Sequence, residues 1–263
     1  MAALFFDVDG TLIDSFHDNR VISPAVRSEL ARVQSLGHKI FLSSGRSRKL
    51  LTPNLLEPGF DGLVLVNGGV VEMGDVPIYE ERMGYDLARA TVDFLVERGL
   101  EYQLVTANDI YTLRSHSLIR SFFDDIGHED FFVYDYDLDE ILNIAIKVES
   151  IVDRDDRERI TAEAAEVLGP AITCDGHGGE GTFELYPTAI SKAKGIEVAL
   201  GQLGLGPKDA YGFGDGTNDL EMLEYCGCGV AMDNAQDEVK AVADLVCPPV
   251  WEDGLAQALS QLF

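Results

Sequence analysis

Two aspartates near the start of the chain have the clearest potential for chemistry. Asp7 and Asp9 directly follow the apolar run Ala3–Phe6, and Gly10 and Thr11 come next. In an extended segment, residues i and i+2 point to the same side, so we expect the two carboxylates to crowd one space. Such crowding costs free energy unless a proton or a cation separates the charges. One carboxylate could then attack an electrophile while the other handles a proton, with a divalent metal ion neutralising both.

Three further polar segments follow apolar runs or open a helical pattern. They are Gly214–Asp219 (GDGTND) after Ala210–Phe213, Ser43–Arg46 (SSGR) after Lys39–Leu42, and Ser191-Lys192 at the start of a helical pattern. In open parallel sheets, ligands bind beyond the carboxyl ends of the strands. We therefore expect the fold to bring Asp7, Ser44, Asp215 and Lys192 to one edge of a sheet.

The elements that would position these residues alternate between strands and helices in the outer thirds of the chain. Apolar runs predict strands at 3–8, 39–43, 62–66, 209–213, 228–231 and 244–246, and a short hairpin joins 70–73 to 77–80. Helical spacing predicts helices from Ser23-Pro24 to Gly37 and at 47–56, 191–203, 217–225, 235–241 and 252–262. This alternation predicts an α/β fold with a doubly wound, Rossmann-like parallel sheet.

The middle third has a different pattern, in which a helix is followed by two strands, and the pattern occurs twice. Helices are predicted at 84–99, 115–125 and 152–167, and strands at 101–106, 109–114, 142–148, 171–174 and 182–186. This pattern favours a small α+β unit with an antiparallel sheet. We expect a core made of residues 1–82 and 188–263, interrupted by an inserted module at 83–187.

The four polar segments, read in order, resemble the four motifs of the haloacid dehalogenase (HAD) superfamily of phosphatases. The tail of the similarity, Gly229–Asp244 followed by Glu252-Asp253-Gly254, resembles the Cof-type branch in particular. The similarity runs from residue 4 to about residue 255, with a gap in the middle third. It implies that the insert is an α+β cap domain of the Cof type, also called type IIB. Ala193 and Asp233 stand where Gly is common in the family, and neither touches the expected chemistry.

The resemblance implies a Mg²⁺-dependent phosphatase that acts on a small phosphorylated metabolite, with a sugar phosphate favoured. Asp7 is then the nucleophile that forms an aspartyl-phosphate, and Asp9 is the general acid and base. The carboxylates of Asp7 and Asp215 and the main-chain carbonyl of Asp9 would bind Mg²⁺, which prefers oxygen ligands. Lys192 would neutralise the charge that develops during transfer.

The remaining expected site residues bind phosphate or support the metal site. Phosphate and substrate contacts are expected from Ser44, Gly45, Arg46 and Asn218, and supporting roles from Thr11 and Asp219. Several alternatives stay open. They are Ser43 instead of Ser44, Lys194 instead of Lys192, a surface ion pair for Arg46, a plain turn at Asn67, and a cap role only for Asn234.

Two other functions compete with phosphate ester hydrolysis. The same residues could transfer a phosphoryl group to another hydroxyl, as a phosphomutase does. A non-catalytic protein that binds a phosphorylated metabolite, or a switch similar to a response regulator, would also use Asp, Lys and Mg²⁺. Receiver domains are about half this length and lack the Asp-x-Asp pair.

Composition excludes several classes of protein. The formal net charge of −26 argues against nucleic acid and anionic membrane surfaces as partners. No apolar stretch has the length of a membrane span, and no signal-peptide pattern is visible, so we expect a cytoplasmic protein. Four cysteines in 263 residues do not form a disulfide framework. The sequence does not indicate the oligomeric state.

Overall fold

The computed structural model describes residues 1–17, 19–125, 131–175 and 182–263. These residues form two compact units. Unit 1 comprises Met1–Gly45, Leu51–Tyr79 and Ser191–Phe263, and unit 2 comprises Arg46–Leu50 and Glu80–Ile190. The predicted boundaries at 82/83 and 187/188 lie three residues from these divisions, while residues 46–50 had been assigned to the core. The role of unit 2 as a cap stays a prediction.

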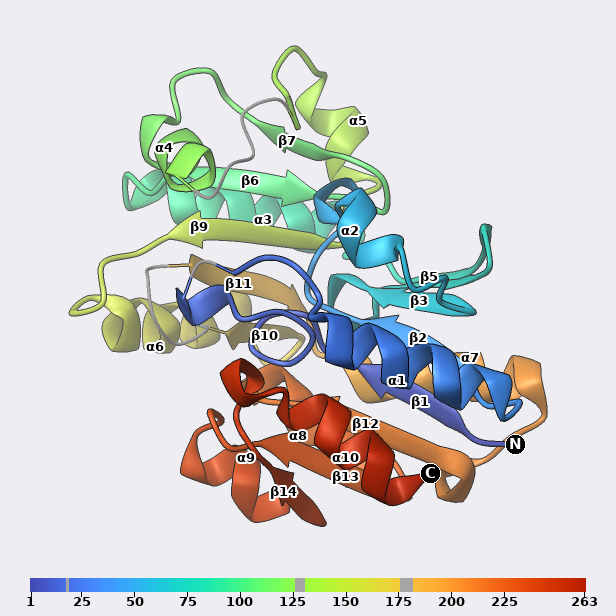
Figure 1. The fold of residues 1–263 in the computed structure, drawn as a ribbon. Helices are drawn as coiled ribbons and strands as arrows, with labels where there is room; N and C mark the ends of the chain where they lie inside the picture. The colour runs from blue at the N-terminus through green and yellow to red at the C-terminus, as the bar shows by residue number, and fades with distance from the viewer. Residues whose placement is uncertain (18, 126–130, 176–181) are drawn as a thin grey trace. The chain divides into compact units, whose positions relative to one another are not determined.

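Unit 1 is built on an eight-stranded sheet in the order β14-β13-β12-β1-β2-β3-β4-β5 (Figure 1). The strands are β1 (Ala3–Phe6), β2 (Lys39–Ser43), β3 (Gly62–Leu65), β4 (Val70–Met73), β5 (Val76–Glu80), β12 (Ala210–Gly214), β13 (Cys228–Met232) and β14 (Leu245–Cys247). The strands from β14 to β3 are parallel, and β4 is antiparallel to β3. The parallel part places six strand ends at one edge.

Helices cover both faces of this sheet. They are α1 (Pro24–Ser35), α2 (Pro53–Leu56), α7 (Lys192–Leu203), α8 (Leu220–Tyr225), α9 (Asp237–Val242) and α10 (Gly254–Leu262). Helices α1 and α10 pack together, and α7 packs with α8 against the other face (Figure 1). Successive strand residues point to opposite faces, so Phe5 stacks on Phe41 and Phe6 stacks on Phe213. The predicted doubly wound α/β fold is confirmed.

Unit 2 contains a second, six-stranded sheet in the order β10-β11-β9-β6-β7-β8. Its strands are β6 (Tyr102–Val105), β7 (Ile110–Thr112), β8 (Phe132–Val133), β9 (Lys147–Ile151), β10 (Ile172–Asp175) and β11 (Thr182–Pro187). Its helices are α3 (Tyr85–Glu97), α4 (Ser117–Asp125), α5 (Leu138–Leu142) and α6 (Arg157–Leu168). All pairs are antiparallel except β7 with β8. Its apolar core includes Phe94, Leu104, Val148, Ile160 and Phe183.

A buried ion cluster occupies the same sheet of unit 2. The Lys147 ammonium lies 2.8 Å from Glu184 Oε1 and also pairs with Glu149. Burial alone would lower the pKa of Lys147, but the carboxylates of Glu149 and Glu184 raise it above its usual value. Arg114, in contrast, forms an exposed pair with Asp135. The cluster therefore depends on Lys147 to balance charge that water does not solvate.

Several predicted elements differ from the structure in their bounds; the helix expected at 152–167, for example, begins at Arg157. The helix expected at 47–56 is a 3₁₀ turn at Arg48–Leu50 followed by α2, because Pro53 favours an extended residue before it and begins a new helix. The strand expected at 142–148 begins only at Lys147, since Asp137 caps the Glu140 amide and starts α5 instead. The first strand, expected to reach residue 8, ends at Phe6.

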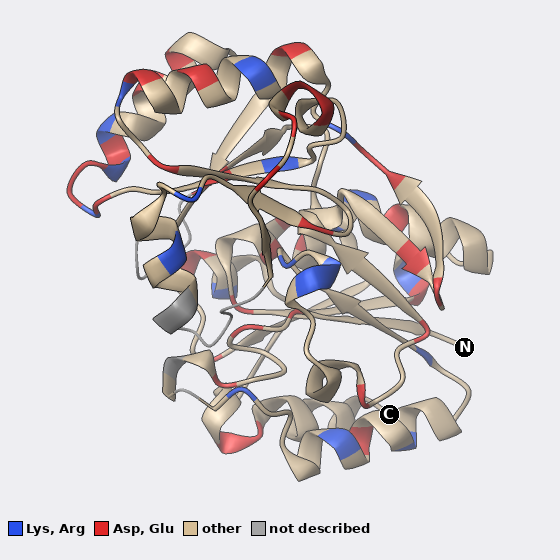
Figure 2. Ribbon diagram, turned by 90° about the horizontal axis from the view of Figure 1, so that it is seen from above, with Lys and Arg blue, Asp and Glu red and all other residues tan. Residues whose placement is uncertain are grey.

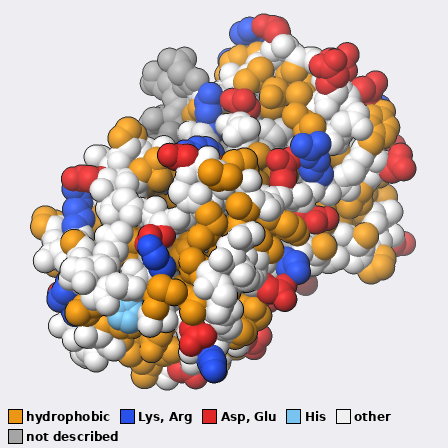
Figure 3. All heavy atoms as spheres, turned by 90° about the vertical axis from the view of Figure 1, so that its right-hand side faces the viewer, with side chains coloured by type: hydrophobic (Ala, Val, Ile, Leu, Met, Phe, Trp, Pro, Cys, Tyr) orange, Lys and Arg blue, Asp and Glu red, His pale blue; other side chains and the backbone are white. Residues whose placement is uncertain are grey.

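Acidic side chains are spread widely over the chain. Figure 2 shows Asp and Glu on helices and loops of both units, with fewer Lys and Arg, in line with 46 acidic and 20 basic residues. On the face seen in Figure 3, charged side chains of both signs are interspersed with hydrophobic ones. No helix in the described part of the chain combines the length and the apolar character that crossing a bilayer requires.

Candidate active site

The carboxyl edge of the parallel sheet brings together the segments that follow β1, β2 and β12. These strands are neighbours, and Phe6 is in register with Leu42 on one side and Phe213 on the other. The amide of Asp7 extends the ladder by donating to the Phe213 carbonyl at 2.9 Å. The residues just beyond the three strands therefore share one edge, as expected from the sequence.

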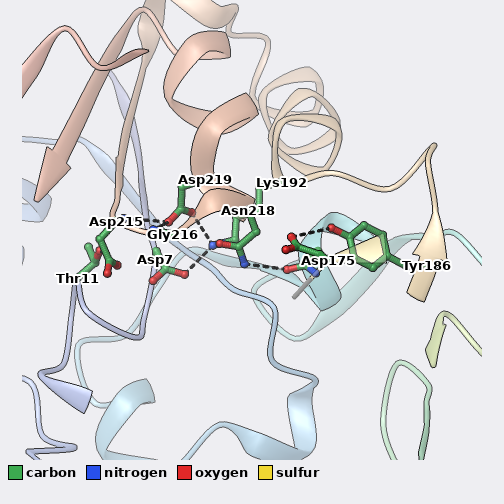
Figure 4. Close-up of polar contacts among 10 residues, drawn as sticks. Asp7, Thr11, Asp175, Tyr186, Lys192, Asp215, Gly216, Asn218 and Asp219 are labelled. Atoms are coloured by element: carbon green, nitrogen blue, oxygen red, sulfur yellow. Dashed lines mark hydrogen bonds and ion pairs between the residues drawn. The ribbon is translucent and has the colours of Figure 1, made fainter. Parts of the chain in front are cut away.

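Lys192 lies at the centre of the acidic residues on this edge. Ser191 caps α7 by accepting a hydrogen bond from Lys194 N, which places Lys192 in the first turn. The Lys192 ammonium lies 2.6 Å from Asp7 Oδ1 and 2.5 Å from Asp219 Oδ1 (Figure 4). Burial lowers the pKa of Lys192, but the two carboxylates more than offset this and raise it. The two carboxylates therefore favour the charged form of this fully buried group.

The alternative lysine has different surroundings. Lys194 is exposed on α7, and its ammonium pairs with Glu197 at 2.6 Å. The geometry therefore favours Lys192 as the lysine beside the acidic residues.

Asp219 holds Lys192 and shapes the loop after β12. Its Oδ1 accepts from Lys192, and its Oδ2 accepts from the amides of Asp215 and Gly216, each at 3.0 Å. A Cβ atom at Gly214 would lie 2.4 Å from the Asp219 carboxyl carbon, so only glycine allows this approach. Both oxygens of Asp219 have donors, and through them Asp219 holds Lys192 and the loop after β12 in place.

The donor set of the cluster fits a hard divalent cation. Asp7, Asp215 and Asp219 each offer a carboxylate oxygen, and these oxygens lie within 4.8 Å of one another. Three carboxylates against the single Lys192 ammonium leave two negative charges when all are ionised. Oxygen ligands and an excess of negative charge are what Mg²⁺ binds. Lys192 contacts Asp7 as well as Asp219, so the choice of Asp7 and Asp215 as the metal ligands stays a prediction.

The pKa values of Asp7 and Asp215 are both raised, so their ionised forms are disfavoured in the metal-free site. Burial raises the pKa of Asp7 to about 7, the charges of Asp219 and Asp9 add to this, and Lys192 opposes it. Burial and the charges of Asp7 and Asp219 raise the pKa of Asp215 well above its usual value. A bound divalent ion would favour the ionised forms of both.

Asp9 differs from the buried carboxylates in its exposure to solvent. The chain turns immediately after β1, with the amides of Leu12 and Ile13 donating to the Val8 carbonyl. Asp7 is buried while Asp9 is exposed, and the Asp9 charge still contributes to the raised pKa of Asp7. Because β1 ends at Phe6, the two residues do not continue that strand, and the expectation that their carboxylates crowd one space stays a prediction.

A second group of contacts joins three loops of unit 1. The Asn67 amide donates to the Ser44 carbonyl at 3.1 Å, and the Asn67 side chain accepts from Asn218 Nδ2 at 3.1 Å. Val66 and Asn67 both adopt positive φ, which is rare for a β-branched residue such as Val66. Backbone strain of this kind concentrates at functional sites. Asn67, which could equally have been a plain turn, thus connects two predicted phosphate-binding segments.

Other predicted residues are not brought to the cluster by the contacts described. Arg46 groups with unit 2, and its Nη1 donates to the Leu50 carbonyl at 3.1 Å. Among the described residues the buried Ser43 hydroxyl has no hydrogen-bond partner, while Ser44 extends the β2 ladder by donating its amide to Val64. The choice between the two serines, and the phosphate-binding role of Gly45 and Arg46, stay predictions.

Asp215 has two side-chain partners, of which only one was expected to belong to the site. Thr11 Oγ1 donates to Asp215 Oδ1 at 3.0 Å, and Asn234 Nδ2 donates to Asp215 Oδ2 at 3.0 Å. For Asn234, a cap role only had been one of the open alternatives. It comes two residues after β13, a neighbour of β12 in the parallel sheet. Asp7 and Asp215 were identified because they follow parallel strands, and the same reasoning could also have identified Asn234.

The chain is similar to known phosphatases over almost its whole length. The family described as haloacid dehalogenase-like hydrolase matches residues 4–259. The Bacillus subtilis protein named "Putative phosphatase YkrA" is 32% identical over 98% of this chain and 96% of its own length. The Bacillus subtilis 5-amino-6-(5-phospho-D-ribitylamino)uracil phosphatase YitU is 26% identical over 98% of this chain and 96% of its own. Among solved structures, the HAD subclass IIB sugar phosphatase BT4131 has a TM-score of 0.87 and 26% identity, covering 99% of this chain and 98% of its own.

Proposed function

Because the chain belongs to the haloacid dehalogenase-like hydrolase family and is a phosphatase, we propose that it hydrolyses a small phosphorylated metabolite, with Mg²⁺ as cofactor and Asp7 as nucleophile. A sugar phosphate is the substrate class we favour, since a relative of nearly equal length is a sugar phosphatase. The observation that carries the proposal is the buried Lys192 ammonium, which bridges Asp7 and Asp219 beside Asp215.

The metal-binding part of the proposal rests on Asp7 and Asp215. Their carboxylates, with the main-chain carbonyl of Asp9, would hold Mg²⁺. When bound, Mg²⁺ supplies positive charge that neutralises the carboxylates and the phosphate oxygens. This charge is needed because the chain as a whole, at −26, repels an anionic substrate at long range.

In the first half-reaction, Asp7 acts as the nucleophile. A carboxylate oxygen of Asp7 attacks phosphorus, the bond between phosphorus and the ester oxygen breaks, and Asp9 gives its proton to the leaving alkoxide. Lys192 holds the Asp7 carboxylate in place through Oδ1 and stabilises the negative charge of the transferring group.

In the second half-reaction, Asp9 acts as the base. It takes a proton from a water molecule, the water oxygen attacks phosphorus, and the bond from phosphorus to Asp7 breaks. Inorganic phosphate leaves, Asp7 is again a carboxylate and Asp9 is again protonated. The exposure of Asp9 suits a group that must meet both the leaving group and water.

The test is a panel of phosphate esters assayed with and without Mg²⁺. Wild-type protein is expected to release phosphate from at least one sugar phosphate only when Mg²⁺ is present, and Asp7→Asn is expected to be inactive. A rapid acid quench should leave one phosphoryl group on the peptide that contains Asp7. No phosphate from any ester would overturn the proposal. An isomeric phosphate ester as product, without inorganic phosphate, would favour phosphoryl transfer to a second hydroxyl instead.

A further inference from the structure

Asn234 connects three segments of unit 1 through its side chain alone. Its Nδ2 donates to Asp215 Oδ2 at 3.0 Å and to the Gly10 carbonyl at 2.9 Å. Its Oδ1 accepts from the Val250 amide at 2.9 Å. The loop after β1, the loop after β12 and the segment before α10 therefore meet at one amide group.

The orientation of this amide follows from its partners. A backbone N–H can only donate, so the Asn234 atom facing Val250 must be the oxygen. The amino group then faces Asp215 and Gly10, where both partners are oxygen acceptors. Its two hydrogens are matched by two acceptors, so the side chain has a single favourable orientation.

The same contacts restrict Asp215. Thr11 donates to one carboxylate oxygen and Asn234 donates to the other, so the plane of the Asp215 carboxylate is held from both sides. The loop after β1 also approaches closely, since a Cβ atom at Gly10 would lie 2.2 Å from Asp215 Oδ2. A carboxylate held in this way needs little rearrangement when it binds a cation.

We propose that Asn234 is a positioning residue for the metal ligand Asp215, and that the Val250 amide fixes Asn234 in the orientation this requires. The inference rests on the proposed function, because it assumes that Asp215 binds Mg²⁺. Asn234 acts through Asp215 and is not itself a catalytic residue. Groups that orient a metal ligand commonly contribute about 10–100-fold to metal affinity or activity.

The experiment measures Mg²⁺ binding to metal-stripped protein by calorimetry, together with thermal unfolding of the same metal-free samples. In Asn234→Ala, Asp215 keeps Thr11 but loses its second donor, and Mg²⁺ is expected to bind about tenfold more weakly. In assays, the Mg²⁺ concentration for half-maximal rate should rise by a similar factor, with a smaller change in the rate at saturating Mg²⁺.

A second variant disturbs Asn234 without changing any side chain of the site. Val250 opens a 3₁₀ turn after Pro249, a position that accepts proline, so Val250→Pro is expected to fold. It removes the N–H that orients the Asn234 amide, and Mg²⁺ should bind about threefold more weakly. Asn143→Ala is the matched control, because that amide donates to the Asp139 carbonyl in unit 2. Its Mg²⁺ affinity should equal that of wild type.

The outcomes separate this inference from the proposed function. If wild type binds no Mg²⁺, both are overturned. If wild type binds Mg²⁺ and Asn234→Ala binds it equally well, the positioning role is wrong and the proposed function stands. A lower unfolding temperature of metal-free Asn234→Ala with unchanged Mg²⁺ affinity would assign Asn234 a purely structural role, and this too would overturn the inference.

Discussion

The Lys192 ammonium and Asp7 Oδ1 are 2.6 Å apart, although 185 positions separate the two residues in the sequence. The same ammonium also contacts Asp219, and all three side chains are at least nine-tenths buried. A buried charge is tolerated only where opposite charges and hydrogen bonds compensate it. Lys192 therefore serves two purposes, since it stabilises the folded arrangement of the acidic loops and supplies positive charge beside the nucleophile.

Replacing Lys192 should lower the rate of hydrolysis. Lys192→Met keeps the aliphatic stem but removes the charge, so we expect kcat to fall by about 10²–10³-fold, as for the loss of a transition-state charge partner. The measurement is steady-state hydrolysis at saturating Mg²⁺.

The matched control on the same helix is Lys194→Met. That ammonium is exposed and pairs with Glu197, so activity should stay within about twofold of wild type. Equal losses in the two variants would show that charge near the start of α7, rather than the contact with Asp7, is what matters.

The stabilisation of the folded protein by Mg²⁺ should depend on pH. The pKa of Asp7 is raised from 3.8 to about 7 in the metal-free fold, chiefly by burial. The folded protein then holds this proton more tightly than the unfolded chain. The stability that protonated Asp7 contributes to the fold is fully present below the pKa of Asp7 in the unfolded chain. It is lost as the pH rises through about 7. Asp215 is shifted in the same direction.

Since Mg²⁺ binds the ionised carboxylates, its affinity should rise over the same range of pH. We expect the gain in Tm on adding Mg²⁺ to be small near pH ~5.5 and large near pH ~8. Calorimetric unfolding with and without Mg²⁺ measures this gain, and Asp7→Asn should reduce its pH dependence. A gain that is independent of pH would contradict the prediction.

The main members of the site could be predicted because their signals are local. Asp7 and Asp215 stand directly after buried apolar strands, and the carboxyl ends of parallel strands meet at one edge whatever the details of the fold. Lys192 was identified by a predicted helix start at 191, and α7 begins at Lys192. These inferences need only secondary structure and topology.

Asn67 and Asn234 also follow parallel strands, but a single Asn in a loop serves many purposes, so this position alone does not reveal their partners. The partners that define Asn234 are a carbonyl at Gly10 and an amide at Val250, which only the tertiary structure brings together. The prediction of a strand from residue 142 was wrong, because Asp137 caps a helix, α5, that extends to Leu142. The different exposure of Asp7 and Asp9 depends on where β1 ends, and the sequence pattern does not set that boundary.

Glycine at position 10 should be required for a steric reason beyond its backbone conformation. Gly10 and Gly37 both have φ of +88°, so alanine at either position adopts an unfavourable left-handed conformation. At Gly10 the added Cβ would also lie 2.2 Å from Asp215 Oδ2, whereas nothing lies within 4 Å at Gly37. Gly37→Ala should lower Tm and keep activity, and Gly10→Ala should also lower kcat/KM by about 10²-fold. Equal activities in the two variants would show that Asp215 tolerates displacement.

The ion cluster of unit 2 should be essential for folding of that unit. Lys147 is 1% exposed, and its ammonium pairs with the carboxylates of Glu149 and Glu184, so Lys147→Met removes a buried positive charge that faces both. Removing one partner of a buried ion pair typically costs about 3–5 kcal/mol. Hydrogen exchange of the amides of β9 and β11 measures the loss, and these strands should exchange much faster.

Arg114→Met, which removes an exposed pair with Asp135, is the control and should leave exchange unchanged. Lys147→Met with wild-type protection would mean that protons, rather than Lys147, neutralise these carboxylates, in keeping with the raised pKa of Glu149, which burial causes.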